Sequence, residues 1–179
     1  MRRLLIGALV IAVLAWAAWR WMHPPSGPAA TGDSKPDSVN TGFKAVRLYF
    51  AAPSGDSLIG ESRELAEAQS LHERVAALVS ELDRGSSGSG LAALPAGTSV
   101  LRVYLDDRGL MTLDLSRAFQ QGFHGGSSAE YLATASLVRT IGANLPEVKR
   151  VLLVCGGAPI ASLGGHLPLD RPIEVSELP

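Results

Sequence analysis

Two histidines stand next to pairs of glycines, and these two stretches hold the residue types best suited to chemistry. In "SLGGHLPLDR" a Gly-Gly pair precedes the histidine, and in "GFHGG" a Gly-Gly pair follows it. An imidazole can act as a general base or as a metal ligand, and glycine lets a loop adopt positive φ. The four histidines of the chain show no H-x-x-x-H or H-E-x-x-H spacing, so we expect no metal site. The residues singled out in this way are His124, Gly125, Gly126, Gly164, Gly165 and His166.

Nucleophilic catalysis would need a serine or cysteine beside a histidine and an acid. Ser116, His166 and Asp114 could form such a set, but Ser116 stands in "DLSRAF" and lacks the G-x-S-x-G turn that exposes a nucleophilic serine. We expect Asp114 or Ser116 to cap the turn after a strand instead. The single cysteine, Cys155, ends an apolar run, which predicts a partly buried strand residue without a catalytic role.

The glycines of "GFHGGSSAE" lie just before a predicted helix, where free N–H groups can bind an anion. The stretch has neither the lysine of a phosphate-binding loop nor the G-x-G-x-x-G order, so nucleotide binding finds no support. Ser127 and Glu130 follow the capping-box pattern, in which a serine and a glutamate satisfy N–H groups at the start of a helix. We therefore expect no nucleotide, cofactor or metal.

Two helices and several strands must position these loops. Apolar residues at helical spacing accompany the capping-box residues Ser70 and Glu73, and Gly85 ends this helix. The second helix starts at Ser127 and stops before Pro146. Apolar runs predict strands at residues 45–51, 61–66, 99–105, 110–115, 148–154, 158–160 and 173–175. The order predicts an α/β (α+β) fold with two helices packed on one face of a mixed β-sheet.

Residues 1–22 carry the signals of a membrane anchor. Two arginines precede 16 uncharged and mostly apolar residues, a run of roughly 24 Å as a helix, near the short end of what spans a bilayer. Three tryptophans gather at its far end, which suits the headgroup boundary. These residues are Arg2, Arg3, Trp16, Trp19 and Trp21. We expect one uncleaved span in the bacterial inner membrane with the rest of the chain on the periplasmic side; a cleaved signal peptide is the alternative.

The rest of the chain divides into a linker and one domain. Residues 23–42 contain four prolines and almost no large apolar side chain, so we expect an extended linker there and a folded domain over 43–179. The formal net charge is −1, from 16 Lys and Arg against 17 Asp and Glu. Without a basic excess to neutralise a phosphate backbone, nucleic acid is excluded as a partner.

The order of these elements resembles the GerMN domain, a spore-germination-type extracytoplasmic module. The matching stretches are "VRLYFA", "LPAGTSVLRVYLDDRGLMTLDLSRAF", "SSAEYLATASLVRTI" and "VLLVCGGAPIASLGGHLPLDRPI". The resemblance spans roughly residues 43–176. The resemblance implies an α/β domain similar to ring-building motifs, anchored to a membrane and facing the envelope space. Sporulation members usually carry two copies in tandem, whereas this chain has one, so a sporulation role is not implied.

These features predict a membrane-anchored binding or assembly module of the cell envelope without catalysis. Loops on a rigid scaffold often carry recognition, so residues 122–126 and 162–170 are the expected contact surfaces. Expected partners, besides the lipid bilayer, are an envelope protein, a second copy of the chain or peptidoglycan. Two other functions stay open: an enzyme or enzyme subunit acting on peptidoglycan, and a sensor of a small molecule or anion.

Overall fold

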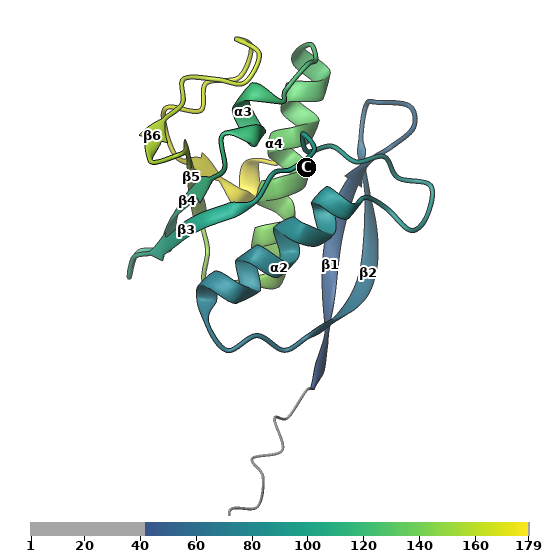
Figure 1. Ribbon diagram of the computed structural model, residues 1–179, viewed down its shortest axis with the longest axis vertical. Coiled ribbons are helices and arrows are strands. Elements are labelled where there is room, and N and C mark those ends of the chain that lie inside the picture. The colour runs from purple at the N-terminus through teal and green to yellow at the C-terminus, as the bar shows by residue number, and fades with distance from the viewer. Residues whose placement is uncertain (1–41, 179) are drawn as a thin grey trace, which may run out of the picture. The chain divides into compact units, whose positions relative to one another are not determined.

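A two-stranded hairpin opens the folded part of the chain (Figure 1). The computed structural model describes residues 42–178. Apolar side chains alternate along β1 (Phe43–Ala51), and two of them, Leu48 and Phe50, are buried. This strand pairs antiparallel with β2 (Leu58–Ala66) along its whole length. The hairpin therefore presents one apolar face to the core and forms a sheet of its own.

The second sheet contains five strands in mixed orientation. β3 (Val100–Leu105) and β4 (Leu110–Leu115) form an antiparallel hairpin, and β4 pairs in parallel with β5 (Arg150–Cys155). Two short strands, β6 (Ala158–Pro159) and β7 (Ile173–Glu174), pair antiparallel with β5. A 3₁₀ turn over Val175–Glu177 follows β7. The predicted α+β class with a mixed sheet is confirmed, but the hairpin β1–β2 lies outside that sheet.

Within the described residues there are three α-helices, one more than the sequence predicted. α2 (Leu71–Arg84) follows the first hairpin. A short helix, α3 (Ala118–Gln121), and the long α4 (Ser127–Asn144) together cross from β4 to the parallel strand β5. α3 was missed because "AFQQ" is too short to show helical periodicity. Its one buried residue is Phe119.

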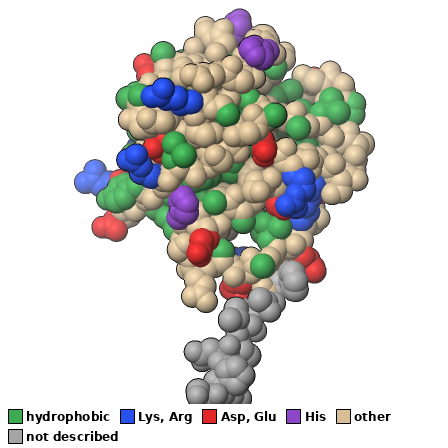
Figure 2. Space-filling view, in the orientation of Figure 1, with side chains coloured by type: hydrophobic (Ala, Val, Ile, Leu, Met, Phe, Trp, Pro, Cys, Tyr) green, Lys and Arg blue, Asp and Glu red, His purple; other side chains and the backbone are tan. Residues whose placement is uncertain are grey.

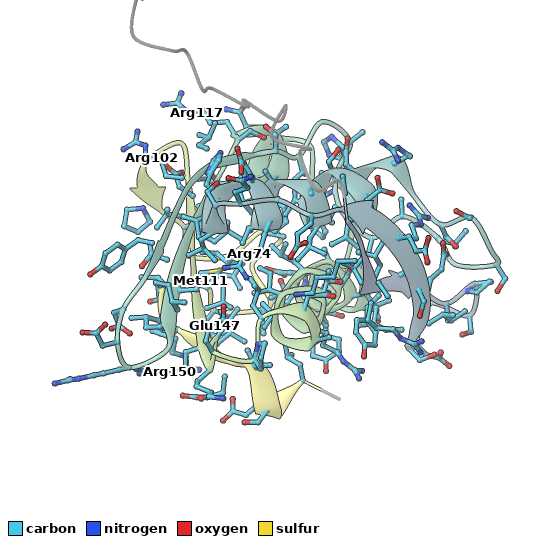
Figure 3. All side chains as sticks on the ribbon, turned by 90° about the horizontal axis from the view of Figure 1, so that it is seen from below. Arg74, Arg102, Met111, Arg117, Glu147 and Arg150 are labelled. Carbon is cyan, nitrogen blue, oxygen red and sulfur yellow. The ribbon has the colours of Figure 1, made fainter. Side chains whose placement is uncertain are left out.

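The core lies between the helices and the inner faces of both sheets. Met111, labelled in Figure 3, is fully buried on β4, as are its strand neighbours at alternate positions. The core side chains from the helices and from β4 and β5 are Val75, Leu78, Val79, Leu82, Leu137, Val138, Ile141, Met111, Leu113, Leu115, Val151 and Leu153. The apolar stripe predicted for α2 thus packs as expected.

Polar side chains of α4 hold the outer edge of β1. Ser136 Oγ donates to the Tyr49 carbonyl at 2.6 Å, and Thr140 Oγ1 accepts from the Tyr49 N–H at 3.0 Å. Asn144 accepts from the Arg47 N–H at 2.9 Å and donates to its carbonyl at 2.7 Å. These side chains lie four residues apart on one helix face. They bond the edge N–H and C=O groups of β1 that a neighbouring strand would otherwise bond. They fix the C-terminal half of α4 against β1.

The predicted anchor over residues 1–22, with Arg2, Arg3, Trp16, Trp19 and Trp21, lies outside the described residues, as does nearly all of the predicted linker. Across residues 42–178, no helix has both the length and the apolar character that crossing a bilayer requires. The predicted domain start at residue 43 coincides with the start of β1.

Candidate functional site

A buried carboxylate on α4 holds the loop that contains His166. Glu130 is fully buried, and its carboxylate accepts from the N–H groups of Leu163 at 2.8 Å and of His166 at 2.9 Å. The same carboxylate lies 3.1 Å from His166 Nδ1. A carboxylate only accepts, so Nδ1 carries the hydrogen in this contact, and Nε2 is the nitrogen left for a ligand. The imidazole is half exposed, with 50% of its side-chain surface open.

The charge of Glu130 is stabilised by backbone N–H groups. Burial raises the pKa of this carboxyl, but hydrogen bonds from the N–H groups of Gly164, His166 and Leu163, together with the imidazole, outweigh burial and lower the pKa to about 2. Glu130 is therefore ionised at neutral pH, and within residues 42–178 no arginine or lysine forms an ion pair with it. A buried charge satisfied in this way orders the loop that supplies the donors.

The capping box predicted for the second helix is wrong. The N-cap of α4 is Gly126, which has no side chain to cap with, and Ser127 is the first helical residue. The Glu130 carboxylate does not accept a hydrogen bond from the N-terminus of its own helix. It bonds instead to a loop more than thirty residues away. The S-x-x-E pattern marked the helix start correctly but gave the wrong partner for the glutamate.

Gly164 and Gly165 are both required by this loop, for different reasons. A Cβ at Gly164 would come within 3.0 Å of the Phe123 ring and 3.1 Å of Glu130 Oε2. Gly165 has φ of 88°, in the region that favours glycine, and its N–H donates to Ser162 Oγ at 2.9 Å. The expectation of positive φ is confirmed at Gly165.

The glycines next to His124 serve another purpose than positive φ. Neither Gly125 nor Gly126 is among the residues with positive φ, and Gly126 has φ of −92°. A Cβ at Gly125 would lie 2.6 Å from the Ala129 side chain, so this glycine permits a close approach to α4. The expectation of positive φ beside His124 is therefore wrong.

The structure brings the two predicted loops together. A Cβ at Gly164 would lie 3.4 Å from the carbonyl oxygen of Gly125, so the loops touch. The fully buried Leu169 anchors the far end of the second loop, and its N–H donates to the Ala161 carbonyl at 2.8 Å. Figure 2 shows histidine side chains exposed at the end of the molecule where Figure 1 places these loops, and His124 and His166 are both exposed. We call residues 122–126 and 162–170 the clamp surface.

Ser116 and Asp114 take part in structural contacts elsewhere. Ser116 Oγ donates to the Gly97 carbonyl and accepts from the Ser99 N–H, each at 3.1 Å. Asp114 accepts from the Gly157 N–H at 2.9 Å. The expectation that Asp114 or Ser116 stabilises a turn is consistent with these bonds. The His166 imidazole contacts the carboxylate of Glu130 and not that of Asp114, so no serine–histidine–aspartate set forms in the described part of the chain.

The environment of Cys155 disfavours a reactive thiol. Burial, and next the nearby carboxylate of Asp114, raise the pKa of the Cys155 thiol to about 11. The thiol is therefore protonated at neutral pH and is a weak nucleophile.

The carboxylate of Asp114 also forms an ion pair with Arg102, at 3.8 Å, and Figure 3 shows Arg102 at the periphery of the molecule. Among residues 42–178, no three His, Cys, Asp or Glu side chains gather closely enough to hold a metal ion.

Comparison with protein families places the fold. The family model named Germane, described as sporulation and spore germination, matches residues 47–161, more than half of the chain. The chain belongs to the Germane family. The resemblance to GerMN domains is thereby confirmed, and the match includes the start of α4 but ends before the second loop of the clamp surface.

Solved structures share this fold at low sequence identity. The tandem GerMN domains of the sporulation protein GerM from Bacillus subtilis align with a TM-score of 0.61 and 18% identity, over 76% of this chain and 48% of that chain. The first GerMN domain of GerM alone aligns with a TM-score of 0.58 and 17% identity, over 73% and 97%. A protein from Clostridium perfringens described as a candidate lipoprotein aligns at 0.54 and 19%, over 76% and 91%. Comparison with curated protein sequences finds no match.

Proposed function

We propose that this Germane-family chain is a membrane-anchored binding or assembly module of the bacterial cell envelope, and that the clamp surface contacts the cell wall. The observation that carries the proposal is the buried Glu130, whose charge is used to order an exposed glycine-rich loop. A loop ordered before binding loses less conformational entropy when a partner binds. An ordered loop with an exposed imidazole therefore suits recognition.

The anchor proposed for residues 1–22 explains how such a module reaches its partner. A linker of about 20 residues has a root-mean-square reach of roughly 25 Å, which holds the domain near the outer face of the inner membrane. Anchoring there raises the effective concentration of the domain for the wall. The similar Clostridium perfringens protein is described as a candidate lipoprotein, which supports a membrane-held domain. Carbonate extraction of membranes tests the anchor: release of the chain into the supernatant would contradict it.

Binding without catalysis fits the side chains of the domain. The hydroxyl of Ser116 is engaged by backbone groups, and the pKa of the Cys155 thiol is raised to about 11. The proposed module should therefore release no muropeptides from sacculi. Soluble fragments appearing with the wild-type chain would favour the alternative of a peptidoglycan-acting enzyme.

The test is co-sedimentation of the full chain, in detergent micelles, with purified sacculi. We expect the wild-type chain to pellet and His166→Ala to pellet much less, because this variant removes the imidazole that Glu130 holds in the clamp surface. His72→Ala is the matched control, since His72 is exposed in the first turn of α2 and bonds to nothing in the clamp surface. If His166→Ala pellets like the wild type, the clamp surface is not the contact. If none of the three pellets, wall binding is wrong, and cross-linking should be used to find a protein partner.

A further inference from the structure

A second feature at the same end of the molecule is a shallow pocket between the β1–β2 turn and the start of α4. Figure 1 shows both segments at that end. The pocket has a volume of about 260 Å³. It is lined by Gly55, Asp56, Ser127, Ser128, Tyr131 and Leu132. The helix residues immediately follow Gly126, so the pocket adjoins the clamp surface.

The carboxylate of Asp56 is oriented before any ligand binds. The hydroxyls of Ser54 and Ser57 donate to its Oδ1 at 2.6 and 2.8 Å. These two hydrogen bonds, with that of Ser54 first, lower the pKa of Asp56, so it is ionised at neutral pH. Both hydroxyls donate to the same oxygen, Oδ1. The pocket therefore offers a fixed, charged acceptor to a donating ligand.

The helix side of the pocket combines an aromatic ring with hydroxyl groups. Ser128, Tyr131 and Leu132 lie three and four residues apart, so they share one face of α4. Tyr131 is partly buried, and Leu132 is 6% exposed and forms an apolar base. The hydroxyl of Ser127, in the first turn of the same helix, is exposed beside them.

These groups select a ligand class. A carboxylate at the rim disfavours anions, and the volume lies below the roughly 300–1,000 Å³ of pockets for drug-sized ligands, so a nucleotide or large cofactor fits poorly. A sugar ring has hydroxyls that donate to a carboxylate and an apolar C–H face that packs on an aromatic ring. We propose that this pocket binds one neutral N-acetylated sugar unit of the wall glycan. The proposal rests on the proposed wall contact, to which it adds the glycan as the bound component.

In the bound state each lining group has a separate role. A sugar hydroxyl donates to Asp56 Oδ2, the C–H face packs on the Tyr131 ring, and the two serine hydroxyls bond to the remaining polar groups of the sugar. The chain of sugars then continues past Gly126 over the clamp surface. A glycan held at both places would lie along one end of the domain.

The experiment is saturation-transfer NMR on the full chain, in micelles of a detergent whose headgroup is not a sugar. The probe is the trimer of N-acetylglucosamine, and inorganic phosphate is added in a competition arm. We expect saturation of the trimer by the wild-type chain and no competition by phosphate. Asp56→Asn and Tyr131→Leu should each weaken the affinity about tenfold or more, the factor that corresponds to one hydrogen bond to a charged group or one aromatic contact.

Two surface positions provide matched controls with the same chemical changes. Asp107→Asn alters an exposed carboxylate in the β3–β4 turn, and Tyr104→Leu alters a tyrosine that is 68% exposed on β3. Both should bind the trimer like the wild type. Equal affinity in pocket and control variants would overturn the pocket assignment, and so would competition by phosphate.

Failure of this proposal and failure of the wall contact give different results. If the wild-type chain pellets with sacculi but shows no saturation of the trimer, the sugar pocket is rejected and the proposed function stands. If the trimer binds through Asp56 and Tyr131 while sacculi do not retain the chain, the sugar site is supported and wall binding through the clamp surface is rejected.

Discussion

The two long helices begin with the same sequence pattern and use it differently. α2 starts at Ser70-Leu71-His72-Glu73, where Ser70 Oγ accepts from the Glu73 N–H at 3.2 Å and the Glu73 carboxylate accepts from the Ser70 N–H at 3.1 Å. α4 starts at Ser127-Ser128-Ala129-Glu130, where Gly126 is the N-cap and no side chain caps the helix. One glutamate therefore bonds within its own turn, and the other bonds to a distant loop.

Burial explains the difference between the two glutamates. Glu73 is exposed on the surface, so the nearest donor is the N–H of its own helix cap. Glu130 is fully buried under a loop whose N–H groups point at it, and these donors outnumber the one N–H that a cap would offer. A buried carboxylate must find all the donors it can, because an unsatisfied charge in the interior is costly. The local motif thus gives way to the tertiary contact.

Loss of the charge on Glu130 should lower the stability of the domain more than loss of the α2 cap or of the His166 imidazole. Glu130→Gln keeps the size of the side chain but offers a single acceptor oxygen to several N–H donors, and its amide N–H groups face the backbone N–H groups of Leu163 and His166. We expect the free energy of unfolding at pH 7 to fall by about 2–3 kcal/mol, since buried donors lose their partner. Denaturant unfolding of the wild type and the variant measures this difference. If Glu130→Gln lowers the free energy of unfolding no more than Glu73→Gln does, the buried contact stabilises the protein no more than the exposed capping contact.

The pH dependence of unfolding gives an independent check on the same variant. The pKa of Glu130 in the folded protein is about 2, lowered from an ordinary value of 4.5. At pH values below 4.5 the unfolded chain therefore binds more protons, so this contribution to stability is complete above pH 4.5 and is lost as pH falls toward 2. Glu61, whose pKa is also about 2, adds to the same decline. The difference in the free energy of unfolding between wild type and Glu130→Gln should shrink as pH falls from 4.5 toward 2. A constant difference would contradict the lowered pKa of Glu130.

A smaller effect is expected at the start of α2. Ser70→Ala removes one half of the capping box and should lower the free energy of unfolding by about 1 kcal/mol. Ser127→Ala is the matched change in α4, where the serine caps nothing, and it should change stability by less than about 0.5 kcal/mol. Denaturant unfolding of both variants makes the comparison. Equal losses would mean that Ser127 contributes to its helix start in a way that the hydrogen bonds do not explain.

Local patterns gave much of the fold from the sequence alone. The capping box at Ser70 and Glu73, the alternation along β1 and the β3–β4 hairpin are each set by neighbouring residues, and each is confirmed. The stretches beside His124 and His166 were correctly expected to be loops, because glycine pairs are typical of loops. Their role as contact surfaces stays a prediction. Their contact with each other depends on the packing of α4, which no local pattern reports.

Long-range polar contacts were the part that sequence reasoning missed. Ser136, Thr140 and Asn144 are polar, so a pattern of hydrophobicity assigns them to a solvated face, yet they bond the edge of β1. The same limit applies to the pocket residues Asp56 and Tyr131, which lie far apart in the chain and line one pocket only in the folded domain. A sequence shows which residues are polar but does not show which buried partner satisfies them.

His166→Ala should change the free energy of unfolding as little as Ser127→Ala does. It therefore tests most directly what the buried Glu130 contributes to function. The imidazole is half exposed, and its contact with Glu130 is one of several that the carboxylate makes. His166→Ala keeps the backbone N–H bond of residue 166, so we expect unfolding to change by less than about 0.5 kcal/mol. Denaturant unfolding measures this change alongside the sacculus assay. If Glu130 orders the loop so that the imidazole can bind, His166→Ala loses retention on sacculi while its stability stays close to that of the wild type. A large loss of stability would instead mean that the imidazole is mainly a structural partner of Glu130, and reduced sedimentation of this variant would then report on folding.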